Sequence, residues 1–297
     1  MNVEEHVSLA RFTTVGIGGP ARWFARPRTL TELEDALRWA EQRGVETAAV
    51  GLGSNLLVAD EGVDALVLRL EGELASVEAR DEMLLVGGGA ANAVCLHRAR
   101  AAGLGGFEFA CAIPGTAGGG VRMNAGAYGG DWAGVVARAL VVDGGGAGWR
   151  TPDELGLEYR RSALGPRDIV ARVEFRLTRR PVEEIKQRIA ELQAQRKATQ
   201  PTNRRTFGSV FKNPQHELGA GAMLEACSLK GYRIGGAQIS LRHANFIENA
   251  GGARSDDALA LMAEARRRTL EEFGVELERE VVLLGRLELP PAGETLV

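Results

Sequence analysis

The sequence predicts an α+β fold made of two small N-terminal lobes and a C-terminal domain. A strand, a glycine-rich turn, a second strand and a helix follow one another twice in the first half of the chain, which predicts the two lobes. Pro181 follows two arginines and precedes a new series of helices and strands, which marks a domain boundary. We therefore expect lobes at residues 1–75 and 76–180 and a third domain at residues 181–297.

The first predicted helix covers residues 31–43. Its apolar side chains share one helical face, Thr31 and Glu34 have the spacing of a capping box, and Gly44 follows its end. Residues 47–50 are short and apolar, which predicts a strand.

Strands and one further helix continue the N-terminal half. Residues 65–70 and 83–86 are strand-like, and residues 91–102 predict a helix that ends at a glycine. Residues 139–143 and 169–177 predict two more strands.

The C-terminal domain is also predicted to mix helices and strands. Residues 182–197 place apolar side chains on one helical face. Residues 255–273 predict a helix whose first turn carries a serine and two aspartates near its positive end. Residues 235–240, 244–247 and 280–284 are strand-like.

Composition and charge limit the classes of function. The 297 residues are 45% hydrophobic, enough to bury substantial cores, and the net charge of −3 is spread without a basic cluster, so we expect no nucleic-acid partner. Residues 1–11 carry acids where a signal peptide carries bases, and no apolar run is long enough to span a membrane. We expect a cytoplasmic protein without a membrane partner. The sequence does not specify an oligomeric state.

Three cysteines, Cys95, Cys111 and Cys227, lie far apart in the sequence. They form no Cys-x-x-Cys pair, so neither a disulfide framework nor a zinc site is indicated. We expect no metal and interpret the cysteines as small buried apolar residues.

The most informative stretch is the glycine-rich segment 113–129. Glycines allow backbone to approach a ligand closely, and successive N–H groups can then bind an anion, so we expect an irregular, non-helical wall around a phosphate-bearing ligand. A flexible linker is the first alternative, but linkers are polar and this segment contains Ile113, Val121 and Tyr128. A dinucleotide-binding turn of the Rossmann type is the second, but no helical period follows Gly120.

A second glycine-rich turn, residues 51–56, follows the strand predicted at 47–50. By itself it fits an ordinary turn, since serine and asparagine between glycines are common in turns. Together with segment 113–129 it predicts contact with the same ligand.

Three further segments carry polar groups whose default interpretation is structural. Residues 159–162 fit a surface turn, and His243 fits a loop histidine. Residues 206–214 mix strand formers with polar groups, and Ser209 follows a glycine without the Gly-x-Ser-x-Gly elbow, which disfavours a serine hydrolase.

Taken in order, these motifs resemble the UDP-N-acetylenolpyruvylglucosamine reductase family, also called UDP-N-acetylmuramate dehydrogenase, and the chain is similar to its shorter members. The resemblance extends from residue 13 to residue 281. The motifs that carry it are Thr13-Thr14-Val15-Gly16-Ile17-Gly18-Gly19, Gly53-Ser54-Asn55-Leu56, Ile113-Pro114-Gly115-Thr116, Met123-Asn124-Ala125-Gly126-Ala127-Tyr128-Gly129, Tyr159-Arg160-x-Ser162, Gly208-Ser209-Val210-Phe211-Lys212-Asn213-Pro214, His243-Ala244-Asn245-Phe246 and Glu280-Val281.

The resemblance implies a two-lobed FAD-binding domain of the vanillyl-alcohol-oxidase type, followed by an α+β substrate-binding domain. No histidine or cysteine precedes a motif as the covalent flavin enzymes require, so the FAD is expected to be non-covalent. The implied cofactor-binding residues are Gly51, Gly53, Ser54, Asn55, Leu56, Ile113, Pro114, Gly115, Thr116, Gly118, Gly119, Asn124, Ala125, Gly126, Ala127 and Tyr128.

It also implies a reaction in two halves, a step of bacterial peptidoglycan precursor synthesis. NADPH reduces the flavin, and the flavin N5 passes hydride to the enolpyruvyl methylene carbon of UDP-N-acetylglucosamine enolpyruvate, giving UDP-N-acetylmuramate. The implied catalytic residues are Arg160 and Glu280, which stabilise the negative charge, and Ser209, which donates the proton. Glu280 is chosen over Glu278 because it precedes a valine. The implied substrate contacts are Arg196, Gln200, Lys212, Asn213 and His243.

Two alternatives stay open. One is an oxidase on the same FAD scaffold, in which O₂ reoxidises the flavin, although the Ser209 motif argues against it. The other is a nucleotide-binding protein without catalysis, which would have no use for Arg160, Ser209 and Glu280. The chain also lacks room for the extra tyrosine-bearing loop of longer family members, and the sequence does not distinguish NADPH from NADH.

Overall fold

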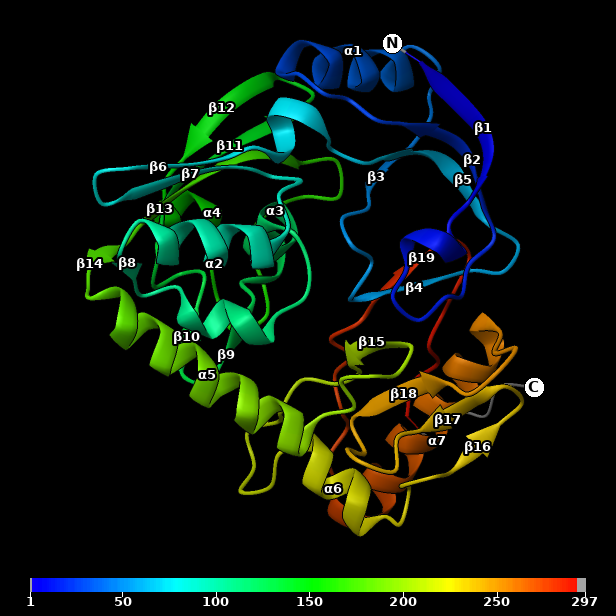
Figure 1. Cartoon of the computed structure of the whole chain (residues 1–297). Coiled ribbons are helices and arrows are strands. Elements are labelled where there is room, and N and C mark those ends of the chain that lie inside the picture. Colours follow the sequence, from blue (N-terminus) through cyan, green and yellow to red (C-terminus); the bar gives the residue numbers. More distant parts are fainter. Residues whose placement is uncertain (1, 293–297) are drawn as a thin grey trace. The chain divides into compact units, whose positions relative to one another are not determined.

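The computed structural model describes residues 2–292 and divides the chain into two compact units (Figure 1). Unit 1 contains the chain up to residue 6 and residues 22–52 and 64–196, and unit 2 contains residues 7–21, 53–63 and those from 197 onward. The division into three parts at residues 75 and 180 stays a prediction.

A four-stranded sheet and a long helix form the first part of the fold. The strands lie in the order β1-β2-β5-β3, with the bounds Val3–Ser8, Pro20–Ala25, Val63–Leu68 and Thr47–Ala49. Helix α1, Leu30–Glu41, buries Leu33, Ala36 and Ala40. The capping box was predicted at Thr31 and Glu34, but the cap lies two residues earlier in the chain. Thr29 caps the helix by accepting from the Glu32 N–H, because Thr29 is the last residue with extended backbone.

An antiparallel five-stranded sheet is the centre of unit 1. Its order is β12-β11-β13-β7-β6, with the bounds Gly146–Arg150, Val136–Asp143, Ile169–Arg176, Met83–Gly87 and Val77–Arg80. Side chains alternate between its faces, as the pleat requires. Val141 and Val170 join a core with four aromatic rings, whereas their chain neighbours Val142 and Ala171 join a second core with α1.

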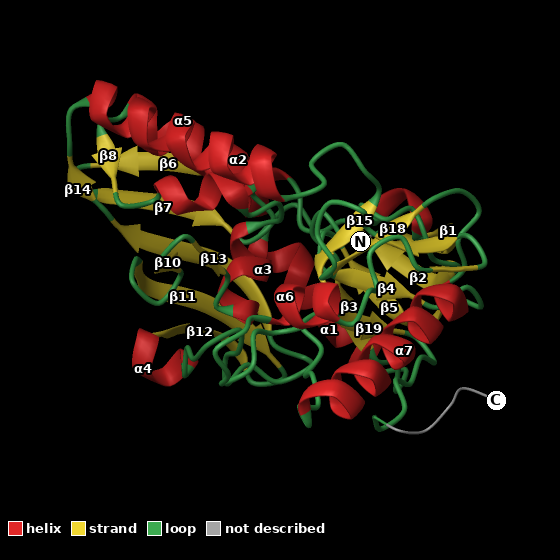
Figure 2. Cartoon of the chain, turned by 90° about the horizontal axis from the view of Figure 1, so that it is seen from below, coloured by secondary structure: helices red, strands yellow, loops and turns green. Residues whose placement is uncertain are grey.

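Helices cover one face of this sheet (Figure 2). Helix α2, Asn92–Ala101, packs against β6 and β7, and helix α3, Ala117–Met123, packs against β13 and β7. The four rings of the aromatic core, Phe107, Phe109, Trp132 and Phe175, meet edge to face or tilted. The smaller elements of unit 1 are β8 Leu104–Gly105, β9 Gly126–Ala127, β10 Gly130–Asp131, β14 Thr178–Arg179, α4 Pro152–Leu155, and the 3-10 helices Gly72–Ala75 and Glu108–Ala112.

Segment 113–129 is not the irregular wall that its glycines predict. It contains helix α3, strand β9 and the turn that joins β9 to β10, which has positive φ at Tyr128 and Gly129. Two of the helix glycines are needed for packing: a Cβ on Gly118 would lie 2.9 Å from the Gly88 carbonyl oxygen, and one on Gly120 would lie 2.3 Å from Trp132 Cε2. The helix forms despite its glycines because its buried face packs on the sheet.

Unit 2 has its own sheets and core. Strands β15 Thr206–Ser209, β18 Phe246–Asn249, β17 Ala237–Ile239 and β16 Arg233–Ile234 form an antiparallel sheet, and β4 Leu56–Val58 pairs in parallel with β19 Val282–Leu284. Helices α6, Ala220–Ala226, and α7, Ser255–Phe273, pack on one core with these strands. Helix α5, Val182–Thr199, and the 3-10 turn Ala10–Phe12 complete the chain.

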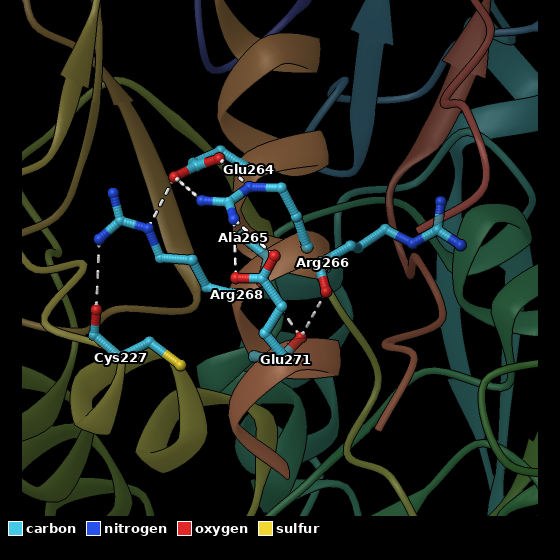
Figure 3. Close-up of polar contacts among 8 residues, drawn as sticks. Cys227, Glu264, Ala265, Arg266, Arg268 and Glu271 are labelled. Carbon is cyan, nitrogen blue, oxygen red and sulfur yellow. Dashed lines mark hydrogen bonds and ion pairs between the residues drawn. The ribbon is translucent and has the colours of Figure 1, made fainter. Parts of the chain in front are cut away.

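Helix α7 carries a network of arginine and glutamate side chains (Figure 3). Glu264 accepts from Arg267 Nε at 2.8 Å and from Arg268 Nε at 2.6 Å, and Arg267 also pairs with Glu271. The hydrogen bond from Arg267, aided by Arg268, lowers the pKa of Glu264. The spacings of three and four residues are those that meet on one helical face.

The prediction that all three cysteines are buried is partly wrong. Cys95 lies on α2 and is buried in the core, but Cys111 and Cys227 are only half-buried. Both of the latter lie at the ends of short helical turns, where packing covers one side only.

Candidate active site

The two glycine-rich motifs touch within unit 1. A Cβ on Gly51 would lie 2.6 Å from Thr116 Oγ1, so only glycine allows the end of β3 to approach this threonine. Thr116 in turn caps α3 by accepting from the Gly119 N–H. The expectation that the two segments contribute to one site is consistent with this contact.

A buried asparagine that the sequence did not single out holds the segment 113–115. Asn92 is 1% exposed, its Nδ2 donates to the Ile113 carbonyl at 3.1 Å, and its backbone N–H donates to the Gly115 carbonyl at 3.0 Å. Its Oδ1 is buried and accepts no hydrogen bond within the described part of the chain. In the sequence, Asn92 is distinguished only as the single polar residue among residues 87–96.

The glycines of α3 fall into two groups. Gly118 and Gly120 are buried against protein atoms, so their lack of a side chain serves packing. Gly119 is exposed, and a Cβ there would meet only Thr116 Oγ1, at 3.4 Å. Of the three, Gly119 is therefore the one whose backbone is open to a ligand.

Asn124 and Arg160 organise the end of this segment. Asn124 is 2% exposed, its Nδ2 donates to the Glu158 carbonyl at 2.9 Å, and its Oδ1 accepts from the Ala133 N–H at 2.9 Å. Arg160 has a φ of +54°, and its Nη2 donates to the Gly126 carbonyl at 2.6 Å. Asn124 thus holds the turn that carries Arg160 close to the predicted cofactor segment, and its amide is used within the protein.

The remaining predicted cofactor residues of this segment surround the hairpin. Ala125 accepts from the Trp132 N–H, and Ala127 pairs with Gly130. Tyr128 Oη is buried without a hydrogen-bond partner among the described residues. Pro114 is exposed on the loop before α3.

In unit 2, the second half of the 51–56 turn lies against the predicted catalytic strand. A Cβ on Gly208 would lie 3.2 Å from the Ser54 carbonyl oxygen. Asn55 Nδ2 donates to the Glu280 carbonyl at 3.1 Å, and Leu56 pairs with Val282. Gly53, which precedes Ser54, accepts at its carbonyl from the Thr14 N–H at 3.1 Å.

Ser209 and Glu280 lie on adjacent segments of unit 2. Ser209 ends β15 opposite Phe246, and the Glu280 N–H donates to the carbonyl of the next residue, Val210, at 2.8 Å. Both are half-buried. Glu278 is exposed and its carboxylate pairs with Lys212 Nζ at 2.5 Å.

The predicted substrate contacts are distributed over both units. His243 Nδ1 accepts from the Asn245 N–H at 3.2 Å, and burial, helped by Lys230, lowers the pKa of the imidazole, which favours its neutral form. Asn213 Oδ1 accepts from the Ala220 N–H at 3.1 Å, and Gln200 follows α5. Arg196, in unit 1, donates weakly to the Cys111 carbonyl at 3.4 Å, and its Nε is buried without a partner among residues 2–292.

These positions form two groups in unit 1 and one group in unit 2. Unit 1 brings together Gly51, Thr116 and Gly119, and separately Gly126 and Arg160. Unit 2 brings together Ser54, Asn55, Ser209 and Glu280. The exposed Gly119 backbone and the unpartnered Tyr128 hydroxyl fit a cofactor with phosphate and hydroxyl groups such as FAD.

Comparisons with known proteins identify the family. Residues 21–151 match an FAD binding domain, and residues 200–284 match the C-terminal domain of UDP-N-acetylenolpyruvoylglucosamine reductase. The chain is 45% identical to UDP-N-acetylenolpyruvoylglucosamine reductase 2 of Symbiobacterium thermophilum, over 93% of this chain and 90% of that protein. The chain belongs to the UDP-N-acetylenolpyruvoylglucosamine reductase family.

Further relatives of this reductase family agree. The protein of that name from Anaeromyxobacter dehalogenans is 44% identical over 95% of this chain and 85% of its own length. The crystal structure of UDP-N-acetylenolpyruvylglucosamine reductase from Thermus caldophilus superposes with a TM-score of 0.84 at 40% identity, covering 96% of this chain and 99% of that one. The predicted fold class, a two-lobed FAD-binding domain of the vanillyl-alcohol-oxidase type with a C-terminal α+β domain, is confirmed. Within residues 2–292 no helix is long and apolar enough to cross a membrane.

Proposed function

We propose that this chain reduces UDP-N-acetylglucosamine enolpyruvate to UDP-N-acetylmuramate with NADPH and non-covalent FAD, in the cytoplasm, as a step of peptidoglycan precursor synthesis. The single observation that favours this function over the two alternatives is the pairing of the Ser209 strand with the Glu280 segment through Val210. Neither an oxidase nor a non-catalytic nucleotide binder has a use for both Ser209 and Glu280, whereas the proposed reaction uses both.

The proposed cofactor-binding residues are those of the two glycine-rich motifs. The Gly51–Thr116 contact and the exposed Gly119 backbone support a role in holding the FAD pyrophosphate. Asn124, which is hydrogen-bonded within the protein, contributes by fixing the backbone of this segment. When bound, FAD accepts hydride from NADPH and supplies it to the enolpyruvyl methylene carbon.

Ser209 is the proposed proton donor. Hydride addition leaves negative charge on the carbon next to the substrate carboxylate, and this strongly basic centre takes a proton even from a hydroxyl if that hydroxyl is well positioned. The β15 pairing with Phe246 supports such positioning. No general base beside Ser209 is required.

Arg160 and Glu280 are the proposed stabilisers of the developing charge. A guanidinium matches a carboxylate in bidentate geometry, and each preorganised donor of this kind is worth about 3 kcal/mol by comparison with oxyanion holes. The hydrogen bond from Arg160 to the Gly126 carbonyl restrains its side chain before substrate binds. Glu280 serves in this role when protonated or bridged to a cation.

The remaining substrate contacts have different electrostatic properties. Lys212 is paired with Glu278 at the surface, so the nucleotide phosphates would compete with that carboxylate for the ammonium group. Burial lowers the pKa of His243, which favours a neutral imidazole as the proposed substrate contact. Arg196, Gln200 and Asn213 complete the proposed set.

Product analysis under nitrogen tests this function against the alternatives. Purified protein with NADPH and the enolpyruvyl nucleotide should form a product two hydrogens heavier than the nucleotide, with one NADPH consumed per product. An oxidase would consume one NADPH per flavin under nitrogen and turn over only after O₂ is admitted, and a non-catalytic binder would consume NADPH in neither condition. Either of these results would refute the proposal.

A further inference from the structure

A buried side-chain amide is hydrogen-bonded to the segment that follows Ser209 at the end of β15. Asn245 is 4% exposed, its Oδ1 accepts from the Phe211 N–H at 2.9 Å, and its Nδ2 donates to the Phe211 carbonyl at 2.8 Å. Its backbone carbonyl also accepts from the Val210 N–H at 3.0 Å. One residue therefore forms three hydrogen bonds with two consecutive residues of this segment.

The other edge of this segment is hydrogen-bonded to the Glu280 segment. The Glu280 N–H donates to the Val210 carbonyl at 2.8 Å, and the Lys212 N–H donates to the Glu278 carbonyl at 2.9 Å. Residues 210–212 thus lie between Asn245 on one side and residues 278–280 on the other. Any displacement of residues 210–212 moves both Ser209, which precedes them, and Glu280, which pairs with them.

The amide replaces backbone pairing that the local fold does not provide. Regular pairing of β15 with β18 ends at Ser209 and Phe246, and the chain before Phe246 turns at His243, whose Nδ1 accepts from the Asn245 N–H. The two polar groups of Phe211 are then left to a side chain. Asparagine has the donor and the acceptor of a peptide group, so it can satisfy both.

We propose that Asn245 is a positioning residue, which fixes Ser209 relative to Glu280 for the proton-transfer half of the reaction. This inference rests on the proposed function. It assigns no contact with substrate or FAD to Asn245, which acts only through residues 209–212 and their pairing with Glu280.

Asn249, the last residue of β18, provides a matched control for Asn245, which immediately precedes that strand. Its Oδ1 accepts from the N–H groups of Gly251 and Ala253, and its Nδ2 donates to the Val15 carbonyl at 3.1 Å. Replacing either asparagine leaves backbone groups unsatisfied and lowers stability, so loss of stability alone does not distinguish the two roles. The two side chains differ in their partners: that of Asn245 is hydrogen-bonded to Phe211, whereas that of Asn249 is hydrogen-bonded to Val15, Gly251 and Ala253.

The experiment compares Asn245→Leu, Asn245→Ser and Asn249→Ser in the FAD-loaded full-length protein. Stopped-flow absorbance measures flavin reduction by NADPH and, separately, reoxidation by the enolpyruvyl nucleotide in H₂O and D₂O. The Asn245 variants should reduce at the wild-type rate but reoxidise roughly 10- to 100-fold more slowly, with a larger solvent isotope effect, because misplacement of a reacting group slows transfer by about this factor. Asn249→Ser should match wild type in both steps.

Hydrogen exchange at the Phe211 and Glu280 amides provides a readout that does not depend on the reaction. Both amides should exchange faster in Asn245→Ser, which keeps a small hydroxyl and is expected to fold if the leucine variant does not. Wild-type reoxidation in Asn245→Ser with accelerated Phe211 exchange would overturn the positioning role, as would equal slowing of both half-reactions. Failure of the wild-type protein to reoxidise with the nucleotide would instead refute the proposed function.

Discussion

Substitution of Gly119 by alanine separates ligand contact from protein packing in the glycine-rich segment. A Cβ at this exposed position would meet only Thr116 Oγ1, at 3.4 Å, among the described protein atoms within 4 Å. Alanine favours a helix over glycine by up to about 1 kcal/mol, so the flavin-free variant should be as stable as wild type or slightly more stable. If the FAD pyrophosphate approaches this backbone, the methyl group should weaken FAD binding by roughly 10- to 100-fold, or about 1.4 to 2.7 kcal/mol.

Gly120→Ala is the packing control, because a Cβ there would lie 2.3 Å from Trp132 Cε2. Overpacking of this kind costs about 1 to 3 kcal/mol of stability, with or without flavin. Gly115 is less informative, since its φ of +138° would strain any side chain. The assay is thermal unfolding of flavin-free protein together with titration of FAD fluorescence. Wild-type FAD affinity in a stable Gly119→Ala variant would refute the contact between Gly119 and the cofactor.

Three further predictions concern single side chains. Ser209→Ala should keep flavin reduction by NADPH but slow reoxidation by the enolpyruvyl nucleotide about 100-fold in stopped-flow experiments, and equal loss in both steps would contradict its assigned role. Burial raises the pKa of the Cys95 thiol to about 12, so iodoacetamide at pH 8 should modify the half-buried Cys111 and Cys227 before Cys95. Peptide mass analysis measures this order. Early labelling of Cys95 would contradict its burial in the packed core. Arginine contacts lower the pKa of Glu264, so its ionised carboxylate stabilises the fold above its unfolded pKa of about 4.3, and this stabilisation is lost as pH falls through the lower folded pKa. The melting temperature of wild type should therefore fall more steeply in that pH range than that of Glu264→Gln. Parallel profiles of melting temperature against pH would show that the ion pairs contribute nothing.

The sequence predicted most helices and strands because their periodicity reflects which face is buried. The helix predicted at residues 31–43 is α1, and the helix predicted at residues 255–273 has the bounds of α7. The cap of α1 was placed two residues late because Thr31 with Glu34 and Thr29 with Glu32 have the same spacing. Only the backbone conformation at Thr29 decides between them.

The glycine content of segment 113–129 predicted an irregular, non-helical backbone, and this prediction is wrong for a physical reason. A glycine that admits a ligand and a glycine that admits Trp132 are identical in the sequence. Helix α3 is stabilised by tertiary packing, which neither its propensity nor its period reveals. The contact of Gly51 with Thr116 likewise depends on partners more than sixty residues apart.

The buried amides were missed as functional groups because their partners are defined only by the fold. Asn92 and Asn245 each bind backbone from a distant segment, and neither sequence neighbourhood shows this. Ser209 and Glu280 were selected by resemblance alone, and the structure adds their shared hydrogen bonding through Val210. Their catalytic roles stay predictions.

The measurement that tests the central claim most directly is an anaerobic absorption spectrum of the purified wild-type protein with two successive additions. The account predicts a bound-flavin band at about 450 nm that is bleached by NADPH, stays bleached, and returns when the enolpyruvyl nucleotide is added. A protein that is colourless and takes up no added FAD would contradict the cofactor assignment. A bleached band that returns only with O₂ would contradict the reductase.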